Sequence, residues 1–307
     1  MKNRILILAG GYSKEREISL ITGKSVKKEL DKQGKYLSKI IDPKGDLIKQ
    51  IRKFKPNVVF NALHGRYGED GYVQMILESE KVKYTHSGVL SSSIAIDKEI
   101  SKKIFIKNKI LTPSYIKHNF NNSPNDFKIL NTIKKKLGFP VVIKPINEGS
   151  SVNVYICNSS NLIKKLKILK PYKEILIEKY IPGREIQSAI LGKTKLGAIE
   201  LKPKRKFYDY EAKYNPKAKT KHIIPINITR KNYIKLMNIS LRAHKVLGCK
   251  GVTRSDFRFY KNKFYLLEVN TQPGMTNLSL VPEIARYRKI SFIKLIEWII
   301  DDASTNR

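Results

Sequence analysis

The chain has 307 residues, enough for two or three domains with hydrophobic cores, and its 41% hydrophobic and 28% charged residues are typical of a globular protein. Its formal net charge is +35 and its pI is near 10.0, which would suit a polyanionic partner such as nucleic acid or an acidic membrane surface. Lysine and arginine are spread over the whole length, however, so we expect a dispersed basic surface instead of a nucleic-acid site.

Cysteine use and hydropathy predict a soluble, cytoplasmic protein. Cys157 and Cys249 are far apart and follow no metal or redox spacing, which fits a reducing compartment. The apolar run 5–9 is too short for the core of a signal peptide, and no apolar run is long enough to cross a bilayer. We therefore expect no membrane partner.

Strand and helix signals alternate at the N-terminus. Apolar runs at 4–9, 36–41 and 58–61 are separated by helical stretches, a pattern typical of a parallel sheet with right-handed crossovers. The glycine pair after the first run is only a weak phosphate-loop signal, because the full dinucleotide fingerprint is absent. A helix is expected to start near Glu15, which by itself could simply favour a helix N-terminus.

A glycine-punctuated loop, residues 61–71 (NALHGRYGEDG), follows the third strand. In open α/β sheets, functional residues favour such loops at the carboxyl ends of strands. A lone histidine such as His64 is more often a satisfied polar side chain than a functional one. The loop residues alone therefore leave the role of His64 open.

The middle of the chain holds a candidate phosphate site. Small, polar residues at 87–97 indicate a first domain boundary. Lys144 ends an apolar strand, where burying an unpaired ammonium would cost on the order of several kcal/mol, so it needs a bound phosphate as partner or must leave the sheet edge into water. Residues 148–153 (EGSSVN) form a short loop whose N–H groups and hydroxyls could close over phosphates.

The segment 202–222 is long and polar and carries several aromatic residues. Loops of this length are usually disordered or functional lids, and the aromatic residues argue against disorder. It follows a strand at 174–179, a Pro-Gly turn, and a pair of strands within 184–200. Core helices are expected at 230–247 and 289–300.

Oxygen-bearing side chains converge near the C-terminus. The strand-like run 255–260 turns back into a second strand, and this pairing brings Asp256 towards Glu268 and Asn270, which share one face by alternation. Two carboxylates and an amide suit Mg²⁺, which prefers a few protein oxygens together with phosphate oxygens. The alternative is a solvated strand face; Arg254, on the same face as Asp256, favours a site.

Taken together, these motifs resemble those of the D-alanine–D-alanine ligases, a family with the ATP-grasp fold. The matching segments are 10–20 (GGYSKEREISL), 61–71, 148–153, 251–256 (GVTRSD), 266–276 (LLEVNTQPGMT) and 279–282 (SLVP). The resemblance spans nearly the whole chain in one order. It implies ATP-dependent ligation of two D-alanine molecules through a D-alanyl phosphate, for peptidoglycan precursor synthesis.

The fold implied by the resemblance is α/β, with an N-terminal parallel-sheet domain followed by two α+β subdomains that clasp ATP. The expected bounds are 1–96 for the N-terminal domain, 97–182 for the central subdomain and 183–307 for the C-terminal subdomain, with an omega loop at about 203–222. Asn153 stands where the family usually has glycine, and we expect a small loss of loop flexibility there.

The resemblance also implies roles for individual residues. Glu15 would hold the ammonium of the first D-alanine and His64 its carboxylate, while Ser279 and Leu280 would hold the carboxylate of the second. Arg254 and the N–H of Gly274 would stabilise the tetrahedral oxyanion. Tyr214 would hydrogen-bond Ser150 and link the two lids near Glu15. ATP would be bound by Lys98, Lys144, Ser151, Glu178, Lys179, Ile181, Glu185 and Lys213.

The implied cofactor is a pair of Mg²⁺ ions, with Mn²⁺ as an alternative, on Asp256, Glu268 and Asn270. A homodimer is expected from the family. Tyr214 stands where related depsipeptide-forming ligases have histidine, which favours D-alanine over D-lactate as second substrate and leaves D-serine open. Two other functions stay open: a basic nucleic-acid-binding protein and an ATP-grasp ligase for another amino acid or carboxylate.

Overall fold

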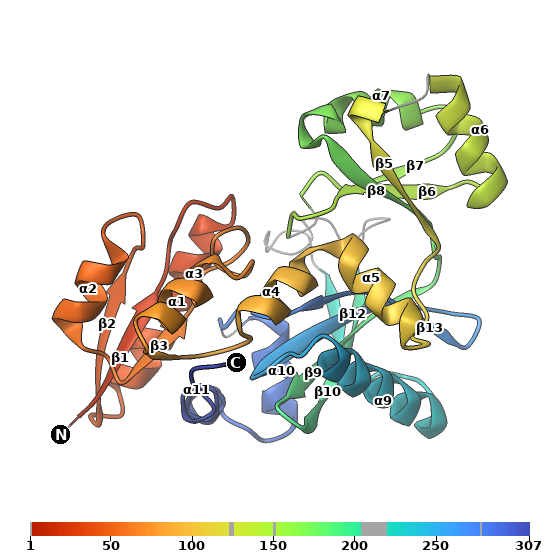
Figure 1. Cartoon of the computed structure of the whole chain (residues 1–307). Coiled ribbons are helices and arrows are strands. Elements are labelled where there is room, and N and C mark those ends of the chain that lie inside the picture. The colour runs from red at the N-terminus through yellow and green to blue at the C-terminus, as the bar shows by residue number, and fades with distance from the viewer. Residues whose placement is uncertain (1, 123–125, 150–151, 204–219, 277) are drawn as a thin grey trace.

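Three sheets organise the chain. The computed structural model describes residues 2–122, 126–149, 152–203, 220–276 and 278–307. The sheets have strand orders β2-β1-β3-β4, β5-β8-β6-β7 and β11-β10-β9-β12-β13. Figure 1 shows the first sheet with its helices on the left, the second at the upper right and the third below it.

The N-terminal unit is a parallel sheet, as the alternation of strands and helices predicted. Its elements are β1 (Asn3–Leu8), α1 (Arg16–Asp31), β2 (Tyr36–Ile41), α2 (Leu47–Phe54), β3 (Val58–Asn61), α3 (Tyr72–Ser79), β4 (Lys83–Tyr84) and α4 (Val89–Ile96). Ile5 and Ile7 of β1 enter one core cluster, and Leu6 and Leu8 enter another. Helices cover both faces of the sheet, which is why this strand is an unbroken apolar run.

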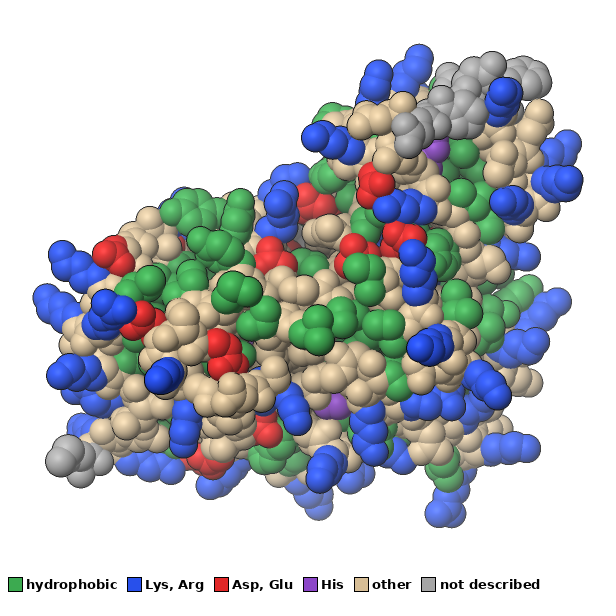
Figure 2. Space-filling model, in the orientation of Figure 1, with side chains coloured by type: hydrophobic (Ala, Val, Ile, Leu, Met, Phe, Trp, Pro, Cys, Tyr) green, Lys and Arg blue, Asp and Glu red, His purple; other side chains and the backbone are tan. Residues whose placement is uncertain are grey.

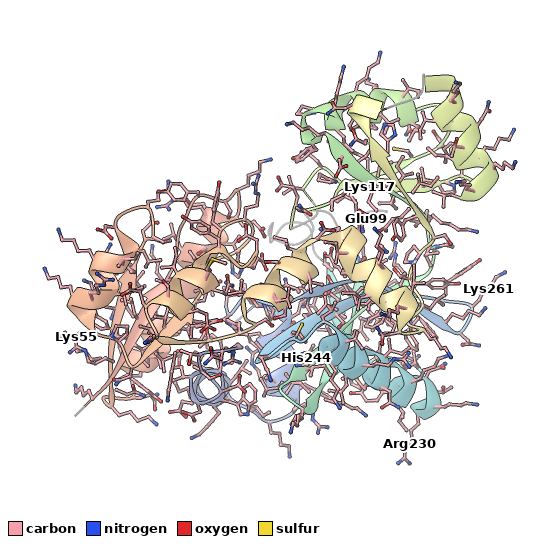
Figure 3. The ribbon with its side chains drawn as sticks, viewed as in Figure 1. Lys55, Glu99, Lys117, Arg230, His244 and Lys261 are labelled. Atoms are coloured by element: carbon pink, nitrogen blue, oxygen red, sulfur yellow. The ribbon has the colours of Figure 1, made fainter. Side chains whose placement is uncertain are left out.

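The central unit is an antiparallel sheet reached through α5. Its elements are α5 (Lys98–Lys107), β5 (Tyr115–Asn119), α6 (Asp126–Lys136), β6 (Val141–Pro145), β7 (Tyr155–Cys157), α7 (Leu162–Leu169) and β8 (Glu174–Lys179). Glu99 of α5 and Lys117 of β5 point toward one another, with an N–O distance of 3.3 Å (Figure 3). The residues at 87–97, interpreted from sequence as a boundary, include helix α4.

The C-terminal unit is an antiparallel sheet between helices. Its elements are β9 (Arg184–Leu191), β10 (Thr194–Lys202), β11 (Lys221–Ile223), α9 (Arg230–Val246), β12 (Val252–Tyr260), β13 (Lys263–Asn270), α10 (Leu280–Tyr287) and α11 (Phe292–Asp301). The turn between β12 and β13 has positive φ at Lys261 (46°) and Asn262 (56°), as two-residue hairpin turns of type I′ require. Helix α11 begins three residues later than expected, after the cap Ser291, whose hydroxyl accepts the N–H of Lys294.

The N-terminal and C-terminal units share one hydrophobic core. A single cluster holds Ile5 and Val26 from the first unit and Leu295 and Ile296 from α11. Because interiors pack at crystal-like density, this shared core fixes the first sheet against the third. The loops at the carboxyl ends of β3 and β13 therefore face each other at a defined distance.

The basic residues are dispersed, as the sequence predicted. Figure 2 shows Lys and Arg side chains over the whole visible face of the molecule, with no single basic patch. Among the described residues, no helix is long and apolar enough to span a membrane.

Candidate active site

Two adjoining pockets hold every described residue of the predicted site. The larger, of about 300 Å³, lies between the N-terminal and C-terminal units and is lined by Glu15, His64, Lys98, Arg254, Glu268, Asn270, Gly274, Ser279 and Leu280. The smaller, of about 80 Å³, lies on the central unit's side and is lined by Lys98, Lys144, Glu178, Lys179, Ile181, Glu185, Asp256 and Glu268. Lys98 and Glu268 line both, so the two pockets adjoin at this pair of side chains. Ser150, Ser151, Lys213 and Tyr214 lie outside the described residues.

The predicted metal ligands lie where β12 pairs with β13. Asp256 is directly opposite Glu268, and Arg254 is opposite Asn270. The guanidinium of Arg254 donates twice to the Asp256 carboxylate, from Nε to Oδ1 at 2.8 Å and from Nη2 to Oδ2 at 3.0 Å. Lys98 Nζ is 3.7 Å from Glu268 Oε2. The chain's own cations thus hold the carboxylates in place.

The donor set fits a divalent cation that keeps several ligands from elsewhere. The described residues contain no cluster of three His, Cys, Asp or Glu side chains of the kind that encloses a metal. Two carboxylates and the Asn270 amide supply a partial oxygen shell, and phosphate oxygens would complete it, which is the usual manner of Mg²⁺ binding. The backbone N–H of Gln272 donates to Asn270 Oδ1 at 2.9 Å and so fixes how this amide is turned.

Three lysines gather on the nucleotide side around one buried carboxylate. Lys144 Nζ lies 2.9 Å and Lys102 Nζ 3.0 Å from Glu178 Oε1. The side chains of these two lysines and of Glu178 are buried. Burial acts to raise the pKa of Glu178, but the two lysines outweigh it and the pKa is lowered. Lys98, one helical turn from Lys102 on α5, donates to the carbonyl oxygen of Glu148 at 2.6 Å. The partner of Lys144 is therefore Glu178, and the alternative that its ammonium leaves the sheet for water is wrong.

Lys102 was missed by the sequence analysis. It is fully buried, its Nζ donates to Thr112 Oγ1 at 2.5 Å, and burial lowers its pKa to about 8. The available signal was its spacing of four residues from Lys98, which puts both side chains on one face of a helix.

The first-substrate side of the larger pocket is acidic. Burial, followed by the charge of Arg254, lowers the pKa of His64 to about 4, so its imidazole is neutral near pH 7. Thr22 Oγ1 lies 3.2 Å from His64 Nε2. Burial and the nearby Glu15 raise the pKa of Glu69 to about 8. A site with two carboxyl groups and a neutral imidazole suits an ammonium ligand.

Glu69 had no assigned role in the sequence analysis, although it belongs to the quoted loop 61–71. Its carboxylate accepts the backbone N–H of Gly65, which folds the loop back on itself. Gly149 also approaches this corner: a Cβ there would lie 2.6 Å from Glu15 Oε2. A side chain larger than hydrogen at position 149 would therefore require the Glu15 carboxylate to move.

The second-substrate side lies at the start of α10. Ser279 precedes the helix, and its hydroxyl oxygen accepts the N–H of Thr276 at 3.1 Å. A Cβ on Gly274 would lie 3.1 Å from Ser279 Oγ, so the two residues are neighbours. Backbone N–H groups at a helix N-terminus favour an anion such as a carboxylate.

The nucleotide side continues into an apolar slot. Val142 and Leu267 line the smaller pocket together with Lys179, Ile181 and Glu185. Apolar walls with a few polar groups that fix orientation are typical of pockets that bind small molecules and cofactors. Arg258 Nη1 is 3.4 Å from Glu185 Oε2, which holds that carboxylate at the pocket edge.

Comparisons with known proteins agree with this geometry. A family model described as D-ala D-ala ligase C-terminus matches residues 108–301. The chain is 66% identical to a D-alanine–D-alanine ligase of Pelagibacter ubique over 100% of both chains, and 45% identical to one of Wolbachia pipientis over 97% of this chain and 94% of that one. It is similar to the solved D-alanine–D-alanine ligase of Bacillus anthracis complexed with ATP, with a TM-score of 0.85, 34% identity, and 98% and 97% of the two chains covered.

Proposed function

The chain belongs to the D-alanine–D-alanine ligase family, and from that premise we propose that it joins two D-alanine molecules to D-alanyl-D-alanine with ATP, for peptidoglycan precursor synthesis. One observation carries the proposal for this chain. An acidic pocket that holds Glu15 adjoins a lysine-rich pocket that holds Lys144, and Lys98 and Glu268 line both. The first suits an ammonium and the second suits phosphates.

The reaction has two chemical steps. In the first, a carboxylate oxygen of one D-alanine attacks the γ-phosphorus of ATP, the bond to the β-phosphate oxygen breaks, and ADP leaves. In the second, the amine of another D-alanine attacks the acyl carbon, inorganic phosphate leaves, and the amine loses a proton. Exclusion of water protects the acyl phosphate between the steps.

Residues that line the two pockets support roles in the first step. Glu15 holds the ammonium of the first D-alanine and His64 faces its carboxylate as a neutral donor. Lys98 and Lys144 neutralise phosphate charge, and Glu185 and the backbone near Ile181 hold the ribose and adenine. Mg²⁺ on Asp256, Glu268 and Asn270 would supply Lewis-acid stabilisation of the phosphate oxygens when bound.

The second step uses the other end of the larger pocket. Ser279 and Leu280 hold the carboxylate of the second D-alanine at the start of α10. Arg254 and the N–H of Gly274 stabilise the tetrahedral oxyanion. A guanidinium has five N–H donors, so Arg254 can keep its two bonds to Asp256 and still serve this oxyanion.

The proposal extends to assembly and location. We expect a cytoplasmic homodimer, and exposed apolar side chains on α3 and α4 (Tyr72, Met75 and Leu90) offer a surface for a second copy. Light scattering with size-exclusion chromatography tests the dimer. A monomer at micromolar concentration would contradict it.

The direct test is ADP release by the purified protein with ATP, Mg²⁺ and a panel of D- and L-amino acids. We expect ADP release with D-alanine. The rate with D-serine added shows whether the second subsite also accepts this amino acid. No ADP release with D-alanine would overturn the proposal. Binding to nucleic acid with steep salt dependence, in place of turnover, would favour the alternative suggested by the net charge.

A further inference from the structure

Two buried amide side chains join loops that belong to different sheets. Asn61 ends β3 and precedes the loop that carries His64, whereas Gln272 follows β13 and the candidate metal ligand Asn270. Asn61 Nδ2 donates to Gln272 Oε1 at 2.8 Å, and Gln272 Nε2 donates to the carbonyl oxygen of Leu63. Asn61 is 0% and Gln272 1% exposed.

The amide pair is tied to the substrate loop at several points. Asn61 Oδ1 accepts the N–H of Leu63 at 3.2 Å, and Asn61 Nδ2 also donates to the carbonyl oxygen of Gly68 at 2.9 Å. On the other side, the backbone N–H of Gln272 donates to Asn270 Oδ1. A backbone N–H can only donate, so the atom of Asn270 that faces it is the oxygen. The network thus runs from the His64 loop to the end of β13.

This connection joins the two sides of the pocket between which the phosphoryl group would be transferred in the proposed reaction. In the proposed reaction, the acceptor carboxylate lies on the His64 side and the phosphate lies on the Asn270 side. Reacting atoms must be held about 3–3.5 Å apart and in line, and a misplacement of about 1 Å can cost about 10²-fold in rate. Buried hydrogen bonds are strong and costly to leave unmade, so the amide pair resists a relative shift of the two loops.

We propose that Gln272 is a positioning residue that aligns the first D-alanine subsite with the nucleotide and metal subsite by holding Asn61 and the Leu63 carbonyl. The inference rests on the proposed ligase function. Each subsite keeps its own contacts when the Gln272 side chain is lost. Substrate binding therefore persists while phosphoryl transfer slows.

The test compares Gln272→Met with Gln74→Met. Gln74 is equally buried, and its Nε2 donates to the same Gly68 carbonyl at 2.9 Å, but it comes from α3 within the N-terminal unit. Gln272→Met keeps the backbone N–H that orients Asn270. We expect Tm to fall in both variants. The kcat for ADP release should fall by about 10²-fold only in Gln272→Met. In both variants, the Kd values of D-alanine and a non-hydrolysable ATP analogue should stay close to wild type.

A second variant, Gln272→Asn, keeps a carboxamide at this position but shortens the side chain by one methylene, so it cannot reach both Asn61 and the Leu63 carbonyl oxygen as glutamine does. We expect its kcat for ADP release to fall, but by less than in Gln272→Met, while the Kd values of D-alanine and the ATP analogue stay close to wild type. A simple loss of stability would leave kcat per folded enzyme unchanged.

The outcomes separate the two proposals. If the wild-type protein releases no ADP with D-alanine, the ligase function fails. If it does and Gln272→Met retains wild-type kcat, or Gln74→Met loses as much, Gln272 is not a positioning residue. Wild-type kcat in Gln272→Asn would overturn the inference as well, and this variant decides the matter if Gln272→Met does not fold.

Discussion

The two ends of the candidate site each hold a glutamate away from water, but the pKa values of these two glutamates shift in opposite directions. On the first-substrate side, burial and the negative charge of the nearby Glu15 raise the pKa of Glu69 to about 8. On the nucleotide side, Glu178 lies between Lys102 and Lys144, and its pKa is lowered although it is more deeply buried. Burial disfavours charge in both places, and neighbours decide the outcome. The acidic end thereby suits an ammonium, and the lysine-rich end suits phosphates.

Lys102→Met tests the lysine-rich end of the site, and we expect it to cause the largest loss of folding stability. The change leaves Glu178 with one lysine in a buried setting, and breaking a buried ion pair typically costs about 3–5 kcal/mol in the free energy of unfolding. Denaturant unfolding measures it. The matched control is Lys103→Met on the same helix, whose ammonium is exposed, so water screens its pair with Glu99 and the loss of stability should be much smaller. Equal losses in both variants would contradict the buried cluster.

Arg254→Ala tests whether the Arg254 guanidinium stabilises the tetrahedral oxyanion. Removing one oxyanion donor typically lowers the rate by about 10²–10³-fold, so kcat should fall while calorimetry still detects ATP binding. Arg184→Ala is the control, because Arg184 pairs with Glu200 in the same two-bond geometry on β9 and lines neither pocket. Unchanged turnover in Arg254→Ala would remove this residue from the mechanism.

The smallest expected effect is proton release from Glu69 when D-alanine binds at the acidic end of the site. At pH 7, below its pKa of about 8, the Glu69 carboxyl is mostly protonated. An ammonium bound beside it favours the carboxylate and lowers that pKa, so D-alanine binding should release up to about one proton per site. Calorimetry in buffers of different ionisation enthalpy measures the release. Glu69→Gln should release less; the same release in both would show that Glu69 is not the source.

Much of the chemistry was predictable from the sequence. The ligase family, the α/β ATP-grasp fold and the ATP-dependent ligation of two D-alanines are confirmed by full-length relatives and by a solved structure with a TM-score of 0.85. The domain bounds, the individual site roles, the Mg²⁺ ions, the homodimer and the cytoplasmic location stay predictions. The predicted boundaries at 96/97 and 182/183 fall between α4 and α5 and between β8 and β9.

Side-chain partners at long range were not predictable. Nothing in the residues near Lys144 points to Glu178, and nothing near Asn61 points to Gln272, which is 211 positions away. Such pairs depend on how sheets dock, and sheet docking depends on core packing summed over many residues. Burial then changes what each group does, as the fully buried Lys102 shows.

Local sequence alone is enough to predict the β12–β13 hairpin and the shared face of Glu268 and Asn270. The two-residue side-chain period of a strand and a tight turn at Lys261 and Asn262 are local properties, and they fix the register as far as the pair Phe257 and Leu266. A bulge between Asp256 and Phe257 then shifts the register by one residue and places Asp256 opposite Glu268, which the turn and the alternation do not give. The docking of the sheets decides which cations meet those carboxylates and what protonation states the buried groups adopt. The physical reason is that Coulomb and desolvation energies depend on distances and burial between parts of the chain that local rules do not connect.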